Sequence, residues 1–254
     1  MDKDSNIKIL DTYLGLCTEV YELSKPIAPS DAYAFYREYA RAANGLILEP
    51  MCGTGRFLLP LLEEGFNVHG FDASEHMLKA LYAKAKAKNI NATVWQGFVE
   101  DLKRPEQYNL IFIPSGSFSL IIELDAVKAA LKVFYDHLTN DGILLFEGDT
   151  FKAVPALNVW RGAAWHKPDG QMLMLSQLAT MEDSVCHSIG KYELVYNNSI
   201  IHTEIEELKV RIYDPCELTE LLKSCGFKVR IIKAFEAEAA PDENDEAVVY
   251  ECRK

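Results

Sequence analysis

The sequence predicts an α/β protein with a doubly wound, mostly parallel sheet. From residue 45 to about residue 150, apolar runs of strand length alternate with amphipathic helical segments, and a helix and a strand resume this alternation after residue 214. A turn with two glycines, Gly53 and Gly55, follows the first apolar run. Such alternation is typical of a parallel sheet that helices cover on both faces, and a chain of 254 residues is long enough to bury its core.

The expected elements follow in chain order. A helical region of residues 1–43 precedes a first strand at 45–49, and the glycine turn leads into a helix over 57–64. Ser74 is expected to cap the next helix, and a further helix is expected over 125–138. Other strands are expected at "NVHGFD", "ATVWQG", "YNLIFIP" and "GILLFEGD".

The pattern changes between residues 151 and 213. A loop over 151–170, rich in Trp, Pro and Gly, is followed by three β-like runs, "QMLMLSQLAT", "VCHSIGKYELV" and "IIHTEIEELKVRIY". Because turn residues separate these runs, we expect an antiparallel β insertion over about 151–213, packed beside the main sheet. In a regular strand, Ile205 and Leu208 would point to opposite faces, because they are three positions apart. A bulge or a second buried face is therefore expected near Glu206.

The C-terminal segment resumes the doubly wound pattern. A capping box from Asp214 to Glu217 begins a helix, and "FKVRIIKAF" is a strand. Six acidic residues between 236 and 246 are expected to form a solvated hairpin connection into a last strand, "AVVYEC". We therefore expect a single domain over residues 1–254, with a seven-stranded sheet that is mostly parallel and has an antiparallel last strand.

The composition narrows the range of partners. A formal net charge of -12 disfavours a nucleic-acid partner, because phosphate binding requires a basic face. The N-terminus carries acids and no long apolar run, and no segment reaches the roughly 20 apolar residues of a membrane span. Six cysteines are scattered without a CxxC pair. We expect a cytoplasmic protein with reduced thiols, no membrane association and no catalytic metal.

The glycine turn and two acidic residues restrict the ligand. A dinucleotide fingerprint requires a third glycine at the place of Leu58, so a pyrophosphate ligand is disfavoured. Asp72, at the end of the second strand, is placed to accept the two hydroxyls of a ribose, which suits nicotinamide cofactors and other adenosyl compounds alike. Glu49, at the end of the first strand, would repel a pyrophosphate but suits a ligand with an ammonium group.

Four segments carry a family resemblance. In their order and spacing, "EPMCGTGR", "GFDAS", "QGFVEDL" and "YNLIFIPSGSFSLI" resemble the class I S-adenosylmethionine-dependent methyltransferases. The resemblance covers about residues 33–149, and "LTELLKSCGFKV" extends it toward the C-terminus. It implies a Rossmann-like fold with a helical lid over residues 1–43, and an enzyme that binds S-adenosylmethionine and releases S-adenosylhomocysteine. Three residues depart from the family pattern: Met51 replaces a frequent glycine, Phe98 replaces an acid that often contacts adenine, and Asn109 replaces a frequent aspartate of the fourth segment.

The resemblance also implies the cofactor-binding residues. Glu49 would face the methionine amino group, and the backbone of Met51, Cys52, Gly53 and Gly55 would pass beneath the methionine moiety and the ribose. Asp72 would bind the ribose hydroxyls. Around the adenine, Ala73 and Met77 would lie beside the ring, Phe98 would make an apolar or stacking contact, and the backbone of Val99 would donate a hydrogen bond. The backbone of Pro114 and Ser115 would receive the amine, and Tyr36, Arg37 or Tyr13 would close over the carboxylate.

The sequence identifies neither the methyl acceptor nor the oligomeric state. A sulfonium methyl is already activated, so transfer requires alignment and exclusion of water more than a catalytic motif, and no catalytic residue is assigned. His166, or His202 with Glu204, could act as a base, although solvated surface positions also account for them. We expect transfer to an O or N atom of a small molecule. The alternatives are a noncatalytic adenosyl-binding protein and an NAD-dependent oxidoreductase, which Leu58 and Glu49 disfavour.

Overall fold

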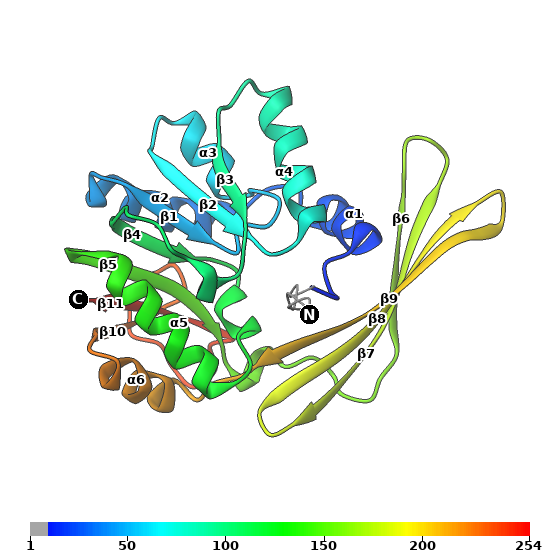
Figure 1. Cartoon of the computed structure of the whole chain (residues 1–254). Helices are drawn as coiled ribbons and strands as arrows, with labels where there is room; N and C mark the ends of the chain where they lie inside the picture. Colours follow the sequence, from blue (N-terminus) through cyan, green and yellow to red (C-terminus); the bar gives the residue numbers. More distant parts are fainter. Residues whose placement is uncertain (1–9) are drawn as a thin grey trace, which may run out of the picture.

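A mixed sheet forms the centre of the protein (Figure 1). Its strands are β1 (Ile47–Pro50), β2 (Val68–Asp72), β3 (Thr93–Gln96), β4 (Tyr108–Ile113), β5 (Leu138–Asp149), β10 (Lys228–Lys233) and β11 (Ala247–Arg253). The computed structural model describes residues 10–254, and within them the sheet has seven strands in the order β10-β11-β5-β4-β1-β2-β3. Strands β1 to β5 pair in parallel, whereas β11 lies antiparallel between β10 and β5. This confirms the predicted doubly wound sheet with an antiparallel last strand.

Helices cover both faces of the sheet. One face carries α2 (Ser30–Ala43), α3 (Leu58–Glu63) and α4 (Glu75–Ala87), and the other carries α5 (Leu124–His137) and α6 (Pro215–Ser224). Successive side chains of a strand point to opposite faces, so Ile47 packs with the first group of helices and Leu48 with the second. None of the helices within residues 10–254 combines the length and the apolar character that crossing a bilayer requires.

Local sequence signals set the ends of several elements. Ser74 caps α4 as predicted, because its Oγ accepts a hydrogen bond from the Met77 N–H at 3.2 Å. Asp214 caps α6 in the same way, accepting from the Cys216 N–H at 2.8 Å. The predicted strand at 45–49 lies at Ile47–Pro50, and β5 begins at Leu138, directly after α5. Residues 139–141, which lie between the predicted helix and the predicted strand, are therefore part of β5.

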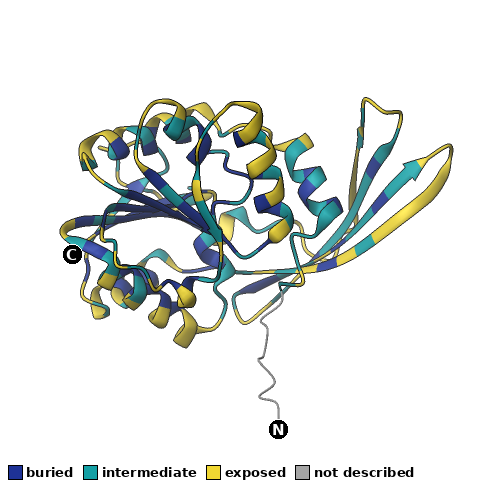
Figure 2. Cartoon of the chain, turned by 45° about the horizontal axis from the view of Figure 1, so that its top comes forward, coloured by how far each residue is buried: buried dark blue, intermediate teal, exposed yellow. Residues whose placement is uncertain are grey.

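A second sheet, the predicted insertion, projects to one side of the main sheet (Figures 1 and 2). Its strands are β6 (Arg161–His166), β7 (Met172–Glu182), β8 (Val185–Tyr196) and β9 (Ser199–Arg211). In the described part of the chain they form an antiparallel four-stranded sheet in the order β6-β7-β8-β9. Exposed residues extend along its outer part, as the yellow segments of Figure 2 show.

Two details of the predicted insertion were wrong. Residues 161–166, expected in a loop, form β6; this edge strand is mostly exposed and holds glycine and alanine, so it lacks the alternation of a half-buried strand. The bulge in β9 lies at Ile201, which the pairing with β8 passes over, and not near Glu206. The pairing is regular at Glu206, because this carboxylate is the buried residue there and Ile205 is 66% exposed.

The N-terminal region carries α1 (Gly15–Ser24) ahead of α2. In Figure 1, α1 lies between α4 and the insertion, and it contacts α4 and strands β7, β8 and β9. The region predicted to be helical over 1–43 is thus helical at 15–24 and 30–43, and its residues 1–9 lie outside the described residues. Helix α1 therefore joins the insertion to the edge of the main sheet at which the parallel strands end.

Candidate active site

The glycine turn joins β1 to α3 at the carboxyl end of the parallel strands. Its backbone adopts positive φ at Met51 (53°), Gly53 (53°) and Gly55 (79°). A Cβ on Gly55 would approach the side chains of Leu59 and Leu81 to 3.0 Å, so this glycine allows α3 and α4 to pack closely against the turn. A Cβ on Gly53 would meet no described atom within 4 Å. The backbone at Gly53 is therefore open to a ligand.

Asp72, the last residue of β2, is bonded to this turn. Its Oδ2 accepts a hydrogen bond from the Gly53 N–H at 2.8 Å, and its Oδ1 accepts one from the Ser74 N–H at 2.8 Å. Burial raises the pKa of Asp72, and the backbone hydrogen bonds of Ser74 and Gly53 lower it. Because each carboxylate oxygen can accept a further hydrogen bond, Asp72 is held in place to bind a pair of hydroxyls.

Glu49 is the last residue but one of the neighbouring strand β1, and one of its oxygens lacks a hydrogen-bond partner among the described residues. Its side chain is buried, and within residues 10–254 no hydrogen-bond partner reaches its Oε2. Burial raises the pKa of Glu49 well above its ordinary value; the positive charge of Arg56 lowers it and the negative charge of Asp72 raises it. A buried acceptor without a donor is costly, and a bound ammonium group would supply that donor. Glu49 and Asp72 thus lie at one edge of the sheet and act on each other electrostatically.

Arg56 follows the glycine turn and provides a cation beside Glu49. Its Nη2 donates a hydrogen bond to Ser115 Oγ at 2.9 Å, and its guanidinium lies 5.0 Å from the centre of the Tyr21 ring. Burial raises the pKa of Tyr21, whereas Arg56 lowers it. Among the described carboxylates, none forms an ion pair with Arg56. A cation without an ion pair in the described chain, beside an acid with one oxygen that lacks a donor there, matches the two ends of an α-amino acid.

Glu147 of β5 fixes the loop that follows β4. Its Oε1 accepts hydrogen bonds from the Tyr36 hydroxyl at 2.9 Å and from the Ser115 N–H at 2.9 Å. Burial raises the pKa of Glu147, and these two hydrogen bonds lower it. Ser115 and Gly116 both adopt positive φ, at 61° and 69°, so the loop turns sharply at the end of β4. The hydroxyl of Tyr36, which we expected near the methionine carboxylate, is bonded to Glu147.

Helix α1 covers the same edge of the sheet. The carbonyl of Tyr13, just before the helix, accepts a hydrogen bond from Ser74 Oγ at 2.7 Å. From the insertion, Glu206 accepts from the Tyr13 N–H at 2.7 Å and Glu204 accepts from the Leu16 N–H at 2.6 Å. Glu204 binds a free N–H group of the first helical turn, where the helix dipole also favours negative charge, and Glu206 binds the segment just before the helix. Helix α1 is therefore held between the insertion and the Asp72 end of the site.

Most of the remaining predicted residues lie at or just after the ends of β1 to β4, and Arg37 lies in α2. Cys52 is buried, and its N–H bonds to the carbonyl of Phe71 at 3.0 Å. Arg37, the other residue proposed to close the site, is paired at the surface with Glu64 at 2.6 Å. The carbonyl of Ala73 accepts a hydrogen bond from the side chain of Gln96, and Phe98 is partly exposed. The other three are buried: Met77 in the first turn of α4, Val99 at the start of a short helix over Val99–Asp101, and Pro114 directly after β4.

Sequence reasoning missed Tyr21, Arg56 and Glu147. Glu147 could have been found by applying to the fifth strand, "GILLFEGD", the rule that selected Glu49 and Asp72 at the ends of their strands. Arg56 directly follows the second glycine of the turn, and this position of a basic residue was the available signal. Tyr21 gave no signal, because only the packing of α1 brings it to Arg56.

The two histidines weighed as bases lie away from this edge. His202 pairs with Glu204 at 3.3 Å, and its side chain is 57% exposed. His166, at the end of β6, is also exposed. Neither is bonded to Glu49, Asp72 or Glu147 in the described chain.

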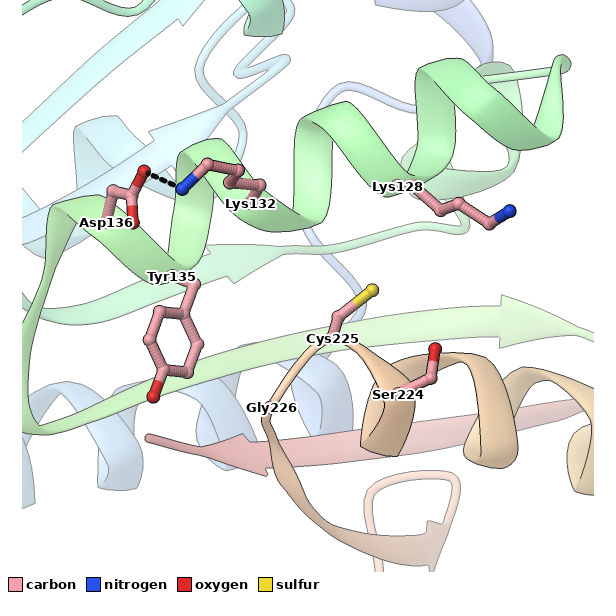
Figure 3. Close-up of a pocket in the computed structure, with 7 residues that line it drawn as sticks. All are labelled: Lys128, Lys132, Tyr135, Asp136, Ser224, Cys225 and Gly226. Atoms are coloured by element: carbon pink, nitrogen blue, oxygen red, sulfur yellow. Dashed lines mark hydrogen bonds and ion pairs between the residues drawn. The ribbon is translucent and has the colours of Figure 1, made fainter.

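A groove between α5 and α6 lies elsewhere (Figure 3). Lys132 and Asp136 form an ion pair at 2.9 Å beside it, and its lining consists of Lys128, Lys132, Tyr135, Asp136, Ser224, Cys225 and Gly226. Tyr135 and Asp136 stand in the last turn of α5, directly before β5 begins. The groove is therefore at the edge where the strands start, whereas ligands of doubly wound sheets bind beyond the carboxyl ends.

Comparison with known proteins agrees with this geometry. Residues 47–142 match the family model described as a methyltransferase domain, a segment that contains Glu49, the glycine turn, Asp72 and Ser115. A protein of Geobacillus sp. (strain WCH70), provisionally named a methyltransferase, is 27% identical over 242 residues, which cover 89% of this chain and 94% of the relative.

Solved structures share the fold. An S-adenosylmethionine-dependent methyltransferase from Clostridium acetobutylicum ATCC 824 superposes with a TM-score of 0.78 at 16% identity, over 93% of this chain and 97% of that chain. The sugar N-methyltransferase KedS8 from Streptoalloteichus sp ATCC 53650 superposes with a TM-score of 0.76 at 14% identity, over 100% of this chain and 99% of that chain. Residues 47–142 thus match a methyltransferase domain, and the whole chain has the fold of the S-adenosylmethionine-dependent methyltransferases.

Proposed function

We propose that the protein transfers the methyl group of S-adenosylmethionine to a nitrogen or oxygen atom of a small molecule. The observation that carries the proposal is the buried Oε2 of Glu49, which lacks a hydrogen-bond partner within residues 10–254. The ammonium group of the methionine moiety is a donor of the charge and size that this oxygen requires.

The neighbouring residues fit the rest of the donor molecule. Arg56 is placed to bind the methionine carboxylate, and Asp72 is placed to accept both ribose hydroxyls. Open space at Gly53 allows the backbone of Met51 to Gly55 to lie under the methionine and ribose. The adenine would then lie toward β3, beside Ala73, Met77, Phe98 and Val99, while the Pro114 and Ser115 backbone lies on the methionine side.

The chain's contribution to the reaction is positioning and exclusion of water. S-adenosylmethionine supplies a methyl group already activated by the sulfonium charge. Glu49 and Asp72 would hold the two ends of the donor on adjacent strands, and the Glu147 bonds would keep the loop after β4 fixed. Helices α1 and α2, acting as the lid, would limit access of water, and alignment of this kind accounts for several kcal/mol of barrier lowering, on the order of 7–11 in well-oriented systems.

The enclosure favours a small acceptor. Helix α1 spans the sheet edge from Ser74 to Arg56, so an acceptor must fit between this helix, the loop after β4 and the start of the insertion. KedS8, whose fold covers 100% of this chain and 99% of its own, is itself named a sugar N-methyltransferase. Together, these features support a small-molecule acceptor over a nucleic acid.

Calorimetric titration of the full chain with S-adenosylmethionine and with S-adenosylhomocysteine tests the proposal. We expect both to bind with one site per chain, and a Glu49→Gln variant to bind S-adenosylmethionine at least about tenfold more weakly. Absence of binding to both compounds would overturn the proposal. Binding of both without methyl transfer to any acceptor would instead favour a noncatalytic adenosyl-binding protein.

A further inference from the structure

Asp149 lies at the carboxyl end of β5, beside the loop that follows β4. The two strands pair in parallel up to Ile113 and Phe146, so β5 ends on the same sheet edge as β1 with its Glu49. A Cβ on Gly116 would lie 3.0 Å from Asp149 Oδ2, which places the carboxylate directly against the loop backbone. The insertion begins after Asp149, so this residue stands between the predicted donor site and the insertion.

The fold does not use the Asp149 carboxylate as it uses Glu147. Glu147, two residues earlier on the strand, accepts hydrogen bonds from Tyr36 and from Ser115. In contrast, no hydrogen-bond donor among residues 10–254 reaches the half-buried side chain of Asp149. Its acceptor capacity is therefore available to a ligand.

The charges around Asp149 come from Lys25, which follows α1, from its own strand and from the connection before β11. Burial raises the pKa of Asp149; the positive charge of Lys25 lowers it and the negative charge of Glu246 raises it. Glu147 is the other acid in electrostatic contact with Asp149. Further along the same edge lies Glu49, whose buried Oε2 is the acceptor assigned above to the ammonium group of the methyl donor, so Asp149 stands apart from the acid that the donor uses.

We propose that Asp149 binds the ammonium group of a small amine and accepts its proton, so that the reaction is N-methylation of a primary or secondary amine. This inference rests on the proposed function and narrows the acceptor from oxygen or nitrogen to an amine nitrogen.

Charge distinguishes an amine from oxygen acceptors at this site. An ammonium group is attracted by Asp149 and Glu147, whereas a phenol would have to become a phenolate, which the same carboxylates would repel. An aliphatic alcohol is so much weaker an acid that a carboxylate gains little by accepting its proton. The formal net charge of -12 also favours the approach of a cationic acceptor.

Protons and electrons balance without a further reactant. The ammonium proton moves to the Asp149 carboxylate, which leaves an amine with a free electron pair. The nitrogen then forms a bond to the methyl carbon while the carbon–sulfur bond breaks and its electron pair remains on sulfur. The methylated nitrogen carries the positive charge that sulfur loses, and Asp149 releases its proton to solvent.

The test uses the full chain, methyl-labelled S-adenosylmethionine and acceptors matched in shape. Ethanolamine and glucosamine are compared with ethylene glycol and glucose, in which a hydroxyl replaces the amine, and catechol represents the phenols. Asp149→Asn is the test variant, and Glu246→Gln, which removes an exposed charge near Asp149, is the matched control. We expect label on an amine only, a loss of about a hundredfold or more in kcat/KM for Asp149→Asn, and a change of about threefold or less for Glu246→Gln.

Calorimetry of the same variants separates this inference from the proposed function. Asp149→Asn should bind S-adenosylmethionine within about threefold of the unmodified chain, since Asp149 contacts the acceptor and not the donor. Label on ethylene glycol, glucose or catechol, no label on either amine, or full activity of Asp149→Asn would each overturn the inference. If the unmodified chain does not bind S-adenosylmethionine, the proposed function itself fails.

Discussion

Glu206 of β9 and Tyr13, which precedes α1, are joined by a hydrogen bond of 2.7 Å from the Tyr13 N–H to the Glu206 carboxylate. The same carboxylate accepts from the Leu14 N–H at 2.9 Å, and it is 4% exposed. On its other side, the Tyr13 carbonyl accepts a hydrogen bond from Ser74 Oγ, two residues beyond Asp72. The insertion is therefore linked through Tyr13 and Ser74 to Asp72.

Replacing Glu206 should loosen α1 and weaken the binding of S-adenosylmethionine. Hydrogen bonds to a charged group contribute about 1.5–3 kcal/mol each, so Glu206→Gln should lower the affinity about tenfold and speed release. Stopped-flow dissociation and calorimetry measure these changes. Glu207→Gln is the control, because Glu207 lies on the exposed face of the same strand. Equal dissociation rates for Glu206→Gln and the unmodified chain would contradict the proposed link.

Replacing Asp72 should abolish donor binding while leaving the fold in place. Asp72→Ala removes the acceptor of two ribose hydroxyls and also the bonds to Gly53 and Ser74, so we expect an affinity loss of about a hundredfold or more. Circular dichroism should remain that of a folded α/β protein. Asp101→Asn, at an exposed acid after β3, serves as the control. Unchanged affinity in folded Asp72→Ala would refute the ribose assignment.

The raised pKa of Glu49 makes the stability of the ligand-free protein depend on pH. Between the ordinary value of 4.5 and the raised folded value, the folded state holds a proton that the unfolded state has released. Stability from this proton is therefore present at low pH and is lost as the pH rises through that window. Glu49→Gln should flatten the curve and raise stability at neutral pH. Urea denaturation across this pH range measures the free energy of unfolding. The same dependence on pH in Glu49→Gln and in the unmodified chain would contradict this prediction.

Donor binding should release a proton through the same residue. The ammonium group favours the charged form of Glu49, so its pKa falls when S-adenosylmethionine binds, and up to about one proton per chain is released. Calorimetry in buffers with different ionisation enthalpies measures this release. The Glu49→Gln variant should release none, and an equal release from both proteins would place the titrating group elsewhere.

Arg56 should act on the amino-acid end of the donor alone. Arg56→Leu should weaken the binding of S-adenosylmethionine about tenfold or more, because the methionine carboxylate loses its cation. Methylthioadenosine lacks the amino acid, so its affinity should not change. Arg37→Leu is the control, since Arg37 is a surface arginine paired with Glu64. A similar loss for both ligands would indicate that Arg56 supports the fold of the turn and not the carboxylate.

Much of the fold could be predicted because its signals are local. The apolar runs that became β1, β4 and β5 and the Ser74 cap of α4 depend on residues a few positions apart. The edge strand β6 could not be predicted, because an exposed segment with glycine and alanine carries no apolar period and is ordered by its pairing with β7. The exposure of Ile205 could not be predicted either, because the buried residue of that stretch is Glu206, whose carboxylate would be expected at the surface.

The sequence by itself determined the sheet, its glycine turn and the placement of Glu49 and Asp72 at strand ends, because strand period and turn chemistry are properties of neighbouring residues. Only the tertiary structure decided which distant groups complete the site: Arg56 with Ser115, Tyr36 with Glu147, and Tyr13 with Glu206. These pairs lie 59, 111 and 193 positions apart in the chain. No local pattern can bring such residues together, so the packing of the helices and the insertion against the sheet does.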